Sequence, residues 1–353
     1  MPLFYEFRTN IVAVDINGEE RVYAFTPTSG DVPKMRCYDF DGNLKWESNI
    51  PGIGEGSFIG ITKDGSVLYA WNVDEIKAYG FDALNGDTLW SISLSAANII
   101  SVGPDDCAYY IGGVYPTFDL IAKVNKQGNV LWSRTLGRGG DTPQKYSWGA
   151  VSSDNTALYI VQLNQTLGRF PITNNVWLIK INPSNGEEIW AIDLLDLYGE
   201  NWGYVLGLTE DDEVVVANYG KIYCFNPDST LKWVTESFNE YGFLKLFARD
   251  LDGTLYVSNG VSIWKCNPGN GNLTHVHDAQ PDEIIRTMAV DKSKRIYYGT
   301  YTYVRCLNNN GDLIWETEFP YSYCPTALAI CKSRLFVSTS DNVWPNGLFC
   351  YSQ

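Results

Sequence analysis

An aromatic residue returns at near-constant intervals along the chain, each time at the end of a polar turn and a short alternating strand. The copies read GNLKW, GDTLW, GNVLW, GEEIW, STLKW, GNLTH and GDLIW, and they end at Trp46, Trp90, Trp132, Trp190, Trp233, His275 and Trp315. Successive end points are 44, 42, 58, 43, 42 and 40 residues apart. A period close to 42 residues is typical of the four-stranded blade of a β-propeller.

The two ends of the chain complete the last blade. Counting one period back from Trp46 reaches Phe4, so the N-terminal strand supplies the outer strand of a blade whose other strands end the sequence. We therefore predict an all-β fold: a single eight-bladed β-propeller over 1–353, with Phe4–Phe7 antiparallel to the strand of Phe349–Tyr351. The expected blades are approximately 11–48, 57–94, 98–136, 146–194, 204–236, 243–277, 284–318 and 326–353 with 1–8.

The recurring tryptophans suggest packing rather than chemistry. One large aromatic residue per repeat is typical of a core position between neighbouring sheets. Aromatic residues make up 14% of the chain, which suits half-buried strands. We expect a blade-packing role for Trp46, Trp90, Trp132, Trp190, Trp233, Trp315 and Phe4.

Two stretches, FDALNGDTLWSISL and INPSNGEEIWAIDL, resemble the repeat of the pyrroloquinoline-quinone-like propellers. That family includes quinoprotein alcohol dehydrogenases and the eight-bladed outer-membrane assembly lipoprotein. The resemblance covers nearly the whole chain and implies the fold more than a function, because the shared motif is structural. The dehydrogenases use a quinone with calcium and carry two adjacent cysteines. This chain has no Cys-Cys pair, and we expect no cofactor.

The eight cysteines are all separated in the sequence. Cys37, Cys224, Cys306 and Cys350 fall at the same strand position of different blades, too far apart for a disulfide. We interpret them as small buried hydrophobic residues and expect eight free thiols. Free thiols favour a reducing compartment or a particle assembled inside a cell.

Signals for metal binding or catalysis are sparse. His275 and His277 alternate on one strand, but the chain has no third histidine, and we expect His275 to pack in the place of a tryptophan. Asp250 and Asp252 resemble part of a calcium loop without its glutamate, and we interpret them as a hairpin turn. We predict no catalytic, cofactor-binding or metal-binding residues. A carboxylate pair for glycoside hydrolysis stays open, because such pairs form in space.

Within each blade, strands A to D alternate in direction, so the A–B and C–D turns share one end and the B–C and D–A connections share the other. The first set is short and repetitive, whereas the second varies strongly. Long loops on a rigid scaffold are common binding sites. We predict a partner-binding face around blades three to five that includes Arg138, Tyr146, Trp148, Arg169, Phe170, Trp202 and Tyr204.

These observations favour a non-catalytic binding or assembly scaffold with a protein or glycan partner. The net charge of −15 disfavours nucleic acid, and no run of 18 apolar residues predicts membrane insertion. The first fifteen residues lack the pattern of a signal peptide, so we expect a cytoplasmic protein or a virion component, such as a tail-associated propeller. The alternative is an enzyme, either a divergent quinoprotein-like dehydrogenase or a hydrolase, with its site in the central channel.

Overall fold

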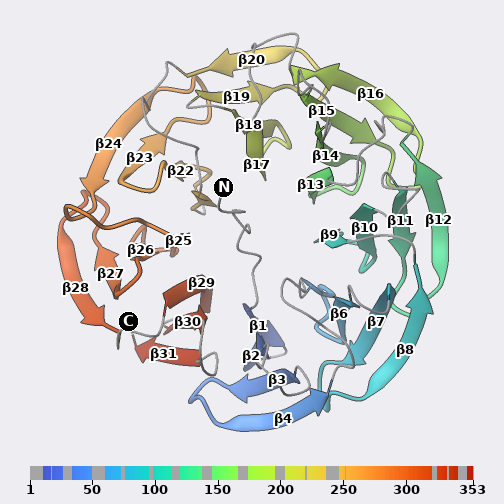
Figure 1. Cartoon of the computed structure of the whole chain (residues 1–353), viewed down its shortest axis with the longest axis horizontal. Helices are drawn as coiled ribbons and strands as arrows, with labels where there is room; N and C mark the ends of the chain where they lie inside the picture. The colour runs from blue at the N-terminus through green and yellow to red at the C-terminus, as the bar shows by residue number, and fades with distance from the viewer. Residues whose placement is uncertain are drawn as a thin grey trace. The chain divides into compact units, whose positions relative to one another are not determined.

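The structure is a computed structural model, and its strands are drawn in Figure 1. It describes residues 11–16, 18–26, 34–49, 60–72, 76–94, 98–112, 120–136, 145–165, 174–194, 203–218, 221–235, 246–250, 252–319, 324–331, 334–340 and 348–352. Two compact units make up the chain. The first unit comprises Met1–Ser93 and Pro281–Gln353, and the second comprises Leu94–Gln280.

The first unit contains blades 1, 2, 7 and 8. Their strands are β1 (Ile11–Ile16), β2 (Glu19–Thr26), β3 (Lys34–Asp39) and β4 (Leu44–Asn49); β5 (Gly60–Ile61), β6 (Val67–Asn72), β7 (Lys77–Asp82) and β8 (Thr88–Ser93); β25 (Thr287–Val290), β26 (Ile296–Gly299), β27 (Tyr303–Leu307) and β28 (Leu313–Glu318); and β29 (Cys324–Cys331), β30 (Arg334–Ser340) and β31 (Leu348–Ser352).

The second unit contains blades 3 to 6. Their strands are β9 (Asn98–Val102), β10 (Ala108–Gly112), β11 (Leu120–Val124) and β12 (Val130–Thr135); β13 (Lys145–Val151), β14 (Leu158–Gln165), β15 (Asn174–Ile181) and β16 (Glu188–Asp193); β17 (Gly203–Leu208), β18 (Val214–Asn218), β19 (Lys221–Phe225) and β20 (Leu231–Val234); and β21 (Leu246–Arg249), β22 (Leu255–Ser258), β23 (Ser262–Cys266) and β24 (Leu273–Asp278).

Each blade is an antiparallel sheet in which strands A, B, C and D are neighbours in chain order. Blade 8 shows three strands, β29–β31, in the part of the chain that the structure describes. The prediction of an all-β propeller with eight blades is confirmed (Figure 1). We call the end of a blade that carries its A–B and C–D turns the turn end, and the end with its B–C and D–A connections the loop end.

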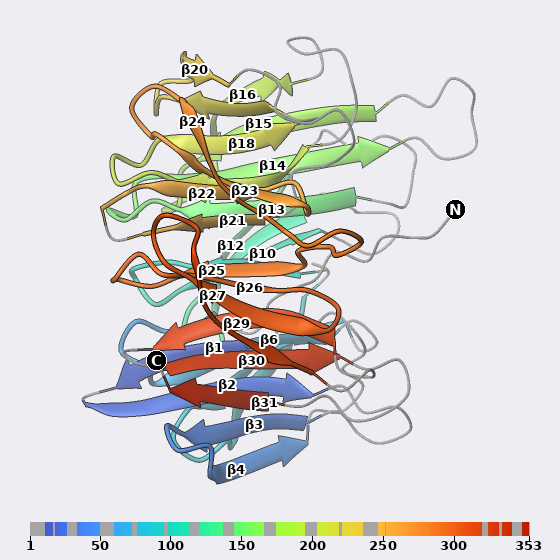
Figure 2. The same ribbon diagram turned by 90° about the vertical axis from the view of Figure 1, so that its left-hand side faces the viewer.

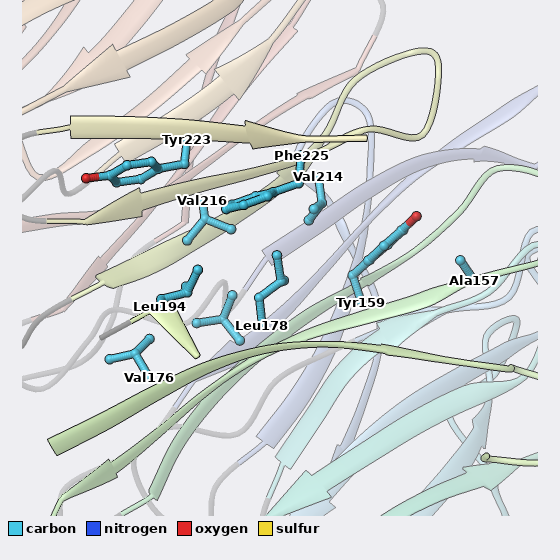
Figure 3. Close-up of a cluster of buried hydrophobic side chains, with 10 residues drawn as sticks. Ala157, Tyr159, Val176, Leu178, Leu194, Val214, Val216, Tyr223 and Phe225 are labelled. Atoms are coloured by element: carbon cyan, nitrogen blue, oxygen red, sulfur yellow. The ribbon is translucent and has the colours of Figure 1, made fainter. Parts of the chain in front are cut away.

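Neighbouring blades within a unit bury apolar faces against one another. Between blades 4 and 5, Tyr159 and Leu178 on one sheet meet Val216 and Phe225 on the next (Figure 3). Strands B and C are buried on both faces, whereas strand D has one outer face. This burial explains the near-continuous apolar runs of the middle strands and the alternating pattern of the outer one.

The recurring tryptophans join consecutive blades within each unit. The indole N–H donates to a backbone carbonyl in the C–D turn of the following blade, over 3.3 Å for Trp46 and Ala83 and 2.8 Å for Trp233 and Pro268. The same bonds join Trp132 to Pro183 and Trp190 to Pro227. In blades 1, 2, 3, 4 and 7 the ring also lies about 6 Å from a strand-B tyrosine of its own blade, as Trp190 does with Tyr159. The tryptophan therefore packs and hydrogen-bonds at once.

A β-bulge interrupts the outer strand of six blades, one residue before the tryptophan. In blade 3, Lys123 pairs with Trp132 and Val124 with Val130, which leaves Leu131 without a partner in the register. The same shift occurs in blades 1, 2, 4, 5 and 7. In blades 2, 3, 4 and 7 the residue at the bulge is aliphatic and about half exposed, namely Leu89, Leu131, Ile189 and Ile314.

The last and first blades lie side by side in the first unit (Figures 1 and 2). Ile11 and Val22 of blade 1 pack with Phe336 of blade 8 in one buried cluster. The Arg334 guanidinium bonds the carbonyl of Phe40 at 2.6 Å and the carboxylate of Asp41 at 2.8 Å. The predicted strand at residues 4–7, including Phe4, lies outside the described residues.

Candidate functional site

In the described turns of blades 1 to 7, polar side chains hold the turn end closed. In the C–D turn of blade 3, Asn125 Oδ1 accepts hydrogen bonds from the backbone N–H groups of Gln127 and Asn129. Asp39 and Asn308 do the same in blades 1 and 7. Such Asx turns satisfy both the side chain and the backbone. The acceptors of these turns are therefore already bonded within the protein.

Ion pairs and hydrogen bonds also connect turn ends within the second unit. Lys123 is almost fully buried, and its ammonium lies 2.6 Å from an Asp105 carboxylate oxygen and 3.0 Å from the carbonyl of Pro183. The Asn155 amide donates to the same carboxylate. Burial raises the pKa of Asp105, but the bonds from Lys123 and Asn155 outweigh it, so the pKa lies below its usual value. This carboxylate is ionised at neutral pH and fixed in place.

The loop end of blade 7 carries a different arrangement. The Arg305 side chain is 6% exposed and donates to Glu283 through two nitrogens and to Glu316 through a third. Burial alone would lower the pKa of Arg305, but the bonds to Glu283 and Glu316 raise it. The ring of Tyr303 lies 4.7 Å from the guanidinium. The bonds between Arg305 and Glu283 thus connect strand β27 to the segment before β25.

An exposed aromatic residue lies in the B–C turn of the same blade. Tyr301, in the B–C turn of blade 7, is 54% exposed, and the Arg286 guanidinium stacks 4.4 Å from its ring centre. Ile284, on the D–A connection, is also exposed. Tyrosine and arginine are among the residues enriched in protein-binding hot spots.

Gln162 is the most unusual polar residue of blade 4. Its side chain has no exposed surface, and neither amide atom has a hydrogen-bond partner among the described residues. Gln162 pairs in register with Ser147 and Trp177 and shares the blade-3 side of its strand with Ile160. Burying an amide without partners is costly, so this position needs an explanation.

The residues predicted for the partner-binding face are only partly within the described ranges. Tyr146 and Trp148 belong to β13, and Tyr204 belongs to β17. The other four, Arg138, Arg169, Phe170 and Trp202, lie outside the described residues. Their part in binding stays a prediction.

The cysteines form no disulfide among the seven whose side chains the structure describes. Six are buried and Cys350 is half-buried. Burial raises the pKa of Cys37 and Cys107 to about 11 and that of Cys224 and Cys266 to about 12. These thiols stay protonated at neutral pH and are poor nucleophiles.

Blade 6 departs from the tryptophan pattern. Its bulge falls one step later, so His275 pairs in register with Trp264 and its ring meets Trp264 edge-on. The rest of the His275 ring is exposed and bonds Asp278 at 2.8 Å. Asp278 also accepts from Ser262, and these bonds lower its pKa. His275 thus has a packing contact, but a smaller one than a tryptophan makes.

The described ranges contain no cluster of three or more histidine, cysteine, aspartate or glutamate side chains arranged to hold a metal ion. Asp250 accepts the backbone N–H groups of Asp252 and Thr254, as a hairpin turn requires. In the same described ranges, no helix is long and apolar enough to span a membrane.

Comparison with known proteins supports the repeat family. Residues 10–180 match the family model described as outer membrane protein assembly factor BamB. BamB from Moraxella catarrhalis is 15% identical, with 97% of this chain and 96% of that chain covered at a TM-score of 0.62. Apo AztD from Citrobacter koseri is 10% identical, with 90% and 89% covered at a TM-score of 0.60. No curated protein matches the chain in sequence.

A third similar structure is that of an enzyme. The dihydro-heme d1 dehydrogenase NirN is 12% identical, with 98% of this chain and 72% of that chain covered at a TM-score of 0.67. Identities this low show a shared fold and nothing of activity. The motifs and the eight blades together fit the pyrroloquinoline-quinone-like propeller family, which confirms the resemblance inferred from the sequence.

Sequence reasoning missed the supporting cluster of Arg305 and the buried amide of Gln162. Arg305 reads as an ordinary polar residue in VRCLN, and its partner Glu283 is 22 residues away. Gln162 lies in an alternating stretch, YIVQLNQ, where a polar residue indicates an exposed position. In the folded structure its side chain is nevertheless fully buried.

Proposed function

We propose that the chain is a non-catalytic binding or assembly scaffold that meets a protein or glycan partner with the loop ends of its blades. The observation that carries this proposal is the contrast between the two ends. At the turn ends, the Asx acceptors are bonded into the turns themselves, as at Asn125 and Asn308. Few hydrogen-bond acceptors of these turns are therefore left to bind a partner, and specific recognition needs such groups.

The loop ends differ from blade to blade in length and chemistry. Strands β14 and β15 of blade 4 have eight residues each, whereas β18 and β19 of blade 5 have five, so the blade 4 hairpin extends further. Blade 7 instead presents the exposed Tyr301 with Arg286 stacked on its ring, and it also contains the buried Arg305. Variable loops on a uniform scaffold are where specific recognition usually resides.

Within this proposal, large rings act as anchors and arginines set orientation. Trp148 and Trp202 bury much area at low entropic cost, while Arg138 and Arg169 pair with carboxylates or backbone carbonyls of the partner. The free thiols are compatible with a cytoplasmic protein or a component of a virion, and we include both settings in the proposal.

The test is a pull-down from the native source with wild-type protein and single variants as bait. We expect Trp148→Ala, Trp202→Ala and Arg169→Ala each to weaken capture of a partner, by at least about 2 kcal/mol for a buried anchor. Asp211→Ala is the matched control, because Asp211 is an exposed residue of a turn end. Loss of capture with Asp211→Ala and retention with the tryptophan variants would place binding at the other end.

A further inference from the structure

One tryptophan position of the propeller is taken by a much smaller residue. In blades 1, 2, 3, 4 and 7, the tryptophan of strand D pairs with a strand C residue that itself pairs with a tyrosine of strand B. In blade 4 this row of paired residues is Tyr159, Lys180 and Trp190. In blade 6 the corresponding row is Tyr256, Lys265 and Thr274. A threonine therefore stands where these other blades have an indole.

His275 does not fill this place, although it ends the blade 6 copy of the repeat in the sequence. Because the bulge of blade 6 falls one step later, His275 pairs with Trp264 instead of with Lys265. Successive residues of a strand point to opposite faces of the sheet, so His275 and Thr274 lie on different faces. The face of blade 6 that corresponds to the tryptophan face of the other blades thus carries Thr274.

A cavity lies at the turn end of blade 6, on this face. Its volume is about 400 Å³, within the range of roughly 300–1,000 Å³ that small-molecule sites have. The residues that line it are Thr254, Lys265, Asn267, Pro268, Asn272 and Thr274. Lys265 and Thr274 are directly opposite each other in the register and therefore share a face. Asn267, Asn272 and Thr274 are exposed, so the cavity is open to solvent.

The lysine of this row is a favourable neighbour for an aromatic ring. Blades 3 and 4 also have a lysine on strand C, and its ammonium lies 5.3 Å from the ring centre of Tyr109 and 5.5 Å from that of Tyr159. In each of these blades the lysine and the indole donate to the same carbonyl, that of Pro183 or Pro227. A cation beside a ring attracts its electron-rich face. Lys265 provides the same charge at the edge of the blade 6 cavity.

We propose that the cavity of blade 6 binds a small neutral aromatic compound of the indole type. Such a ring has the size of the side chain that the same place holds in the other blades. The ring lies against Lys265 and Pro268, and the hydroxyl group of Thr254 or Thr274 accepts the N–H group at its edge. This site is at the turn end and is separate from the loop ends that are proposed to meet a protein or glycan partner.

The first measurement is an NMR titration of the wild-type protein with indole. The methyl resonances of Thr254 and Thr274 should shift as indole is added, because both residues line the cavity. The methyl resonance of Thr230, an exposed residue in the C–D turn of blade 5, should not shift. We expect saturable binding with a dissociation constant of about 1 mM or tighter, as befits a small ring with few contacts.

The second measurement uses a variant that fills the cavity with a ring of the chain itself. We expect Thr274→Trp to weaken indole binding at least about tenfold, because the new side chain takes the place of the ligand. The variant should also unfold roughly 1–3 °C higher, since filling a cavity stabilises the fold. Gln127→Trp is the matched control and should bind indole as the wild type does, because Gln127 is an exposed residue in the C–D turn of blade 3.

Three results would overturn the proposal: indole binding that does not saturate, a shift of Thr230 as large as that of Thr254, or unchanged affinity in Thr274→Trp. The titration uses the wild-type protein, so it decides the location of the site even where Thr274→Trp folds poorly. The pull-down with the loop-end variants does not depend on this cavity. The binding of indole and the binding of a loop-end partner are therefore judged separately.

Discussion

The turn end and the loop end of a blade are formed by the same strands but are stabilised in different ways. At the turn end, Asx side chains close the turns, and in blades 2, 4, 5 and 6 an indole from the preceding blade also caps the C–D turn. At the loop end, blade 7 fastens its connections with a buried arginine, and blade 4 extends a hairpin that leaves a glutamine unsatisfied. The turn ends thus share repeated stabilising bonds, whereas the residues at the loop ends differ from blade to blade.

The difference follows from how each end is connected. A tight turn joins strands that are already neighbours, so its geometry and its residues are narrowly limited. The connections at the loop end can lengthen without disturbing the sheet, because the entropic cost of a longer loop rises slowly. Substitutions at the turn end should therefore affect folding, and substitutions at the loop end should affect binding.

The largest expected effect is at a turn glycine. Gly186 has a φ of +75°, and a Cβ placed there would lie 2.6 Å from the Trp132 ring. We expect Gly186→Ala to lower the free energy of unfolding by about 2–4 kcal/mol, measured by chemical denaturation. Gly42→Ala is the control, since Gly42 has a similar φ of +84° but nothing within 4 Å, and should lose only about 1 kcal/mol. Equal losses for the two variants would show that indole capping contributes little.

An intermediate effect is expected at the buried pair of Asp105 and Lys123. Asp105→Asn leaves the Lys123 ammonium buried without its counter-charge and should cost about 2 kcal/mol at pH 7. The pKa of Asp105 is lower in the folded state than in the unfolded chain. Its contribution is therefore present above the unfolded pKa of about 3.9 and is lost as the pH falls through the folded pKa.

Denaturation curves from pH 7 down to pH 3 test this expectation. The difference between wild type and Asp105→Asn should shrink as the solution becomes acidic. Asp211→Asn, at an exposed position of the same kind of turn, should differ little from wild type at any of these pH values. A difference for Asp105→Asn that stays constant down to pH 3 would contradict the ion-pair account.

The smallest expected change in the free energy of unfolding is at the tryptophan of blade 5 and at the histidine that takes its place in blade 6. Trp233→Phe keeps a ring but removes the hydrogen bond to the carbonyl of Pro268, and we expect a loss of about 1 kcal/mol. His275→Phe in blade 6 should change the free energy of unfolding by less than about 0.5 kcal/mol, because half of the His275 side chain is exposed. Thermal unfolding of both variants provides the measurement, and a larger loss for His275→Phe would reverse the order.

The fold could be predicted from the sequence because each blade repeats the same signals. The spacing from Trp46 to Trp315 sets the size of the repeat, and the turn residues before each tryptophan mark where strand D begins. These signals are local, since a turn and the strand after it lie next to each other in the chain. Local agreement of this kind, repeated seven times, leaves few alternative folds.

The candidate site was harder to predict because its features arise between strands. Burial of Gln162 depends on the packing of a neighbouring blade, and the pairing of Arg305 with Glu283 depends on a connection that returns over the sheet. From the sequence, Gln162 is assigned to the variable B–C connection of blade 4, whereas strand β14 continues past it to Gln165. The anchors Trp148 and Trp202 follow from loop length alone and stay predictions.

The bulges in the described outer strands have a consequence for how molecules of this protein meet one another. The outer strands present unpaired backbone groups and half-exposed aliphatic side chains such as Leu131 and Ile314, a combination that ordinarily invites edge-to-edge association and fibre growth. A bulge twists the strand and breaks the regular spacing of its free N–H and C=O groups, so a second edge cannot align along it. The bulged outer strands of blades 1 to 7 therefore disfavour edge-to-edge pairing although aliphatic side chains on them stay half exposed.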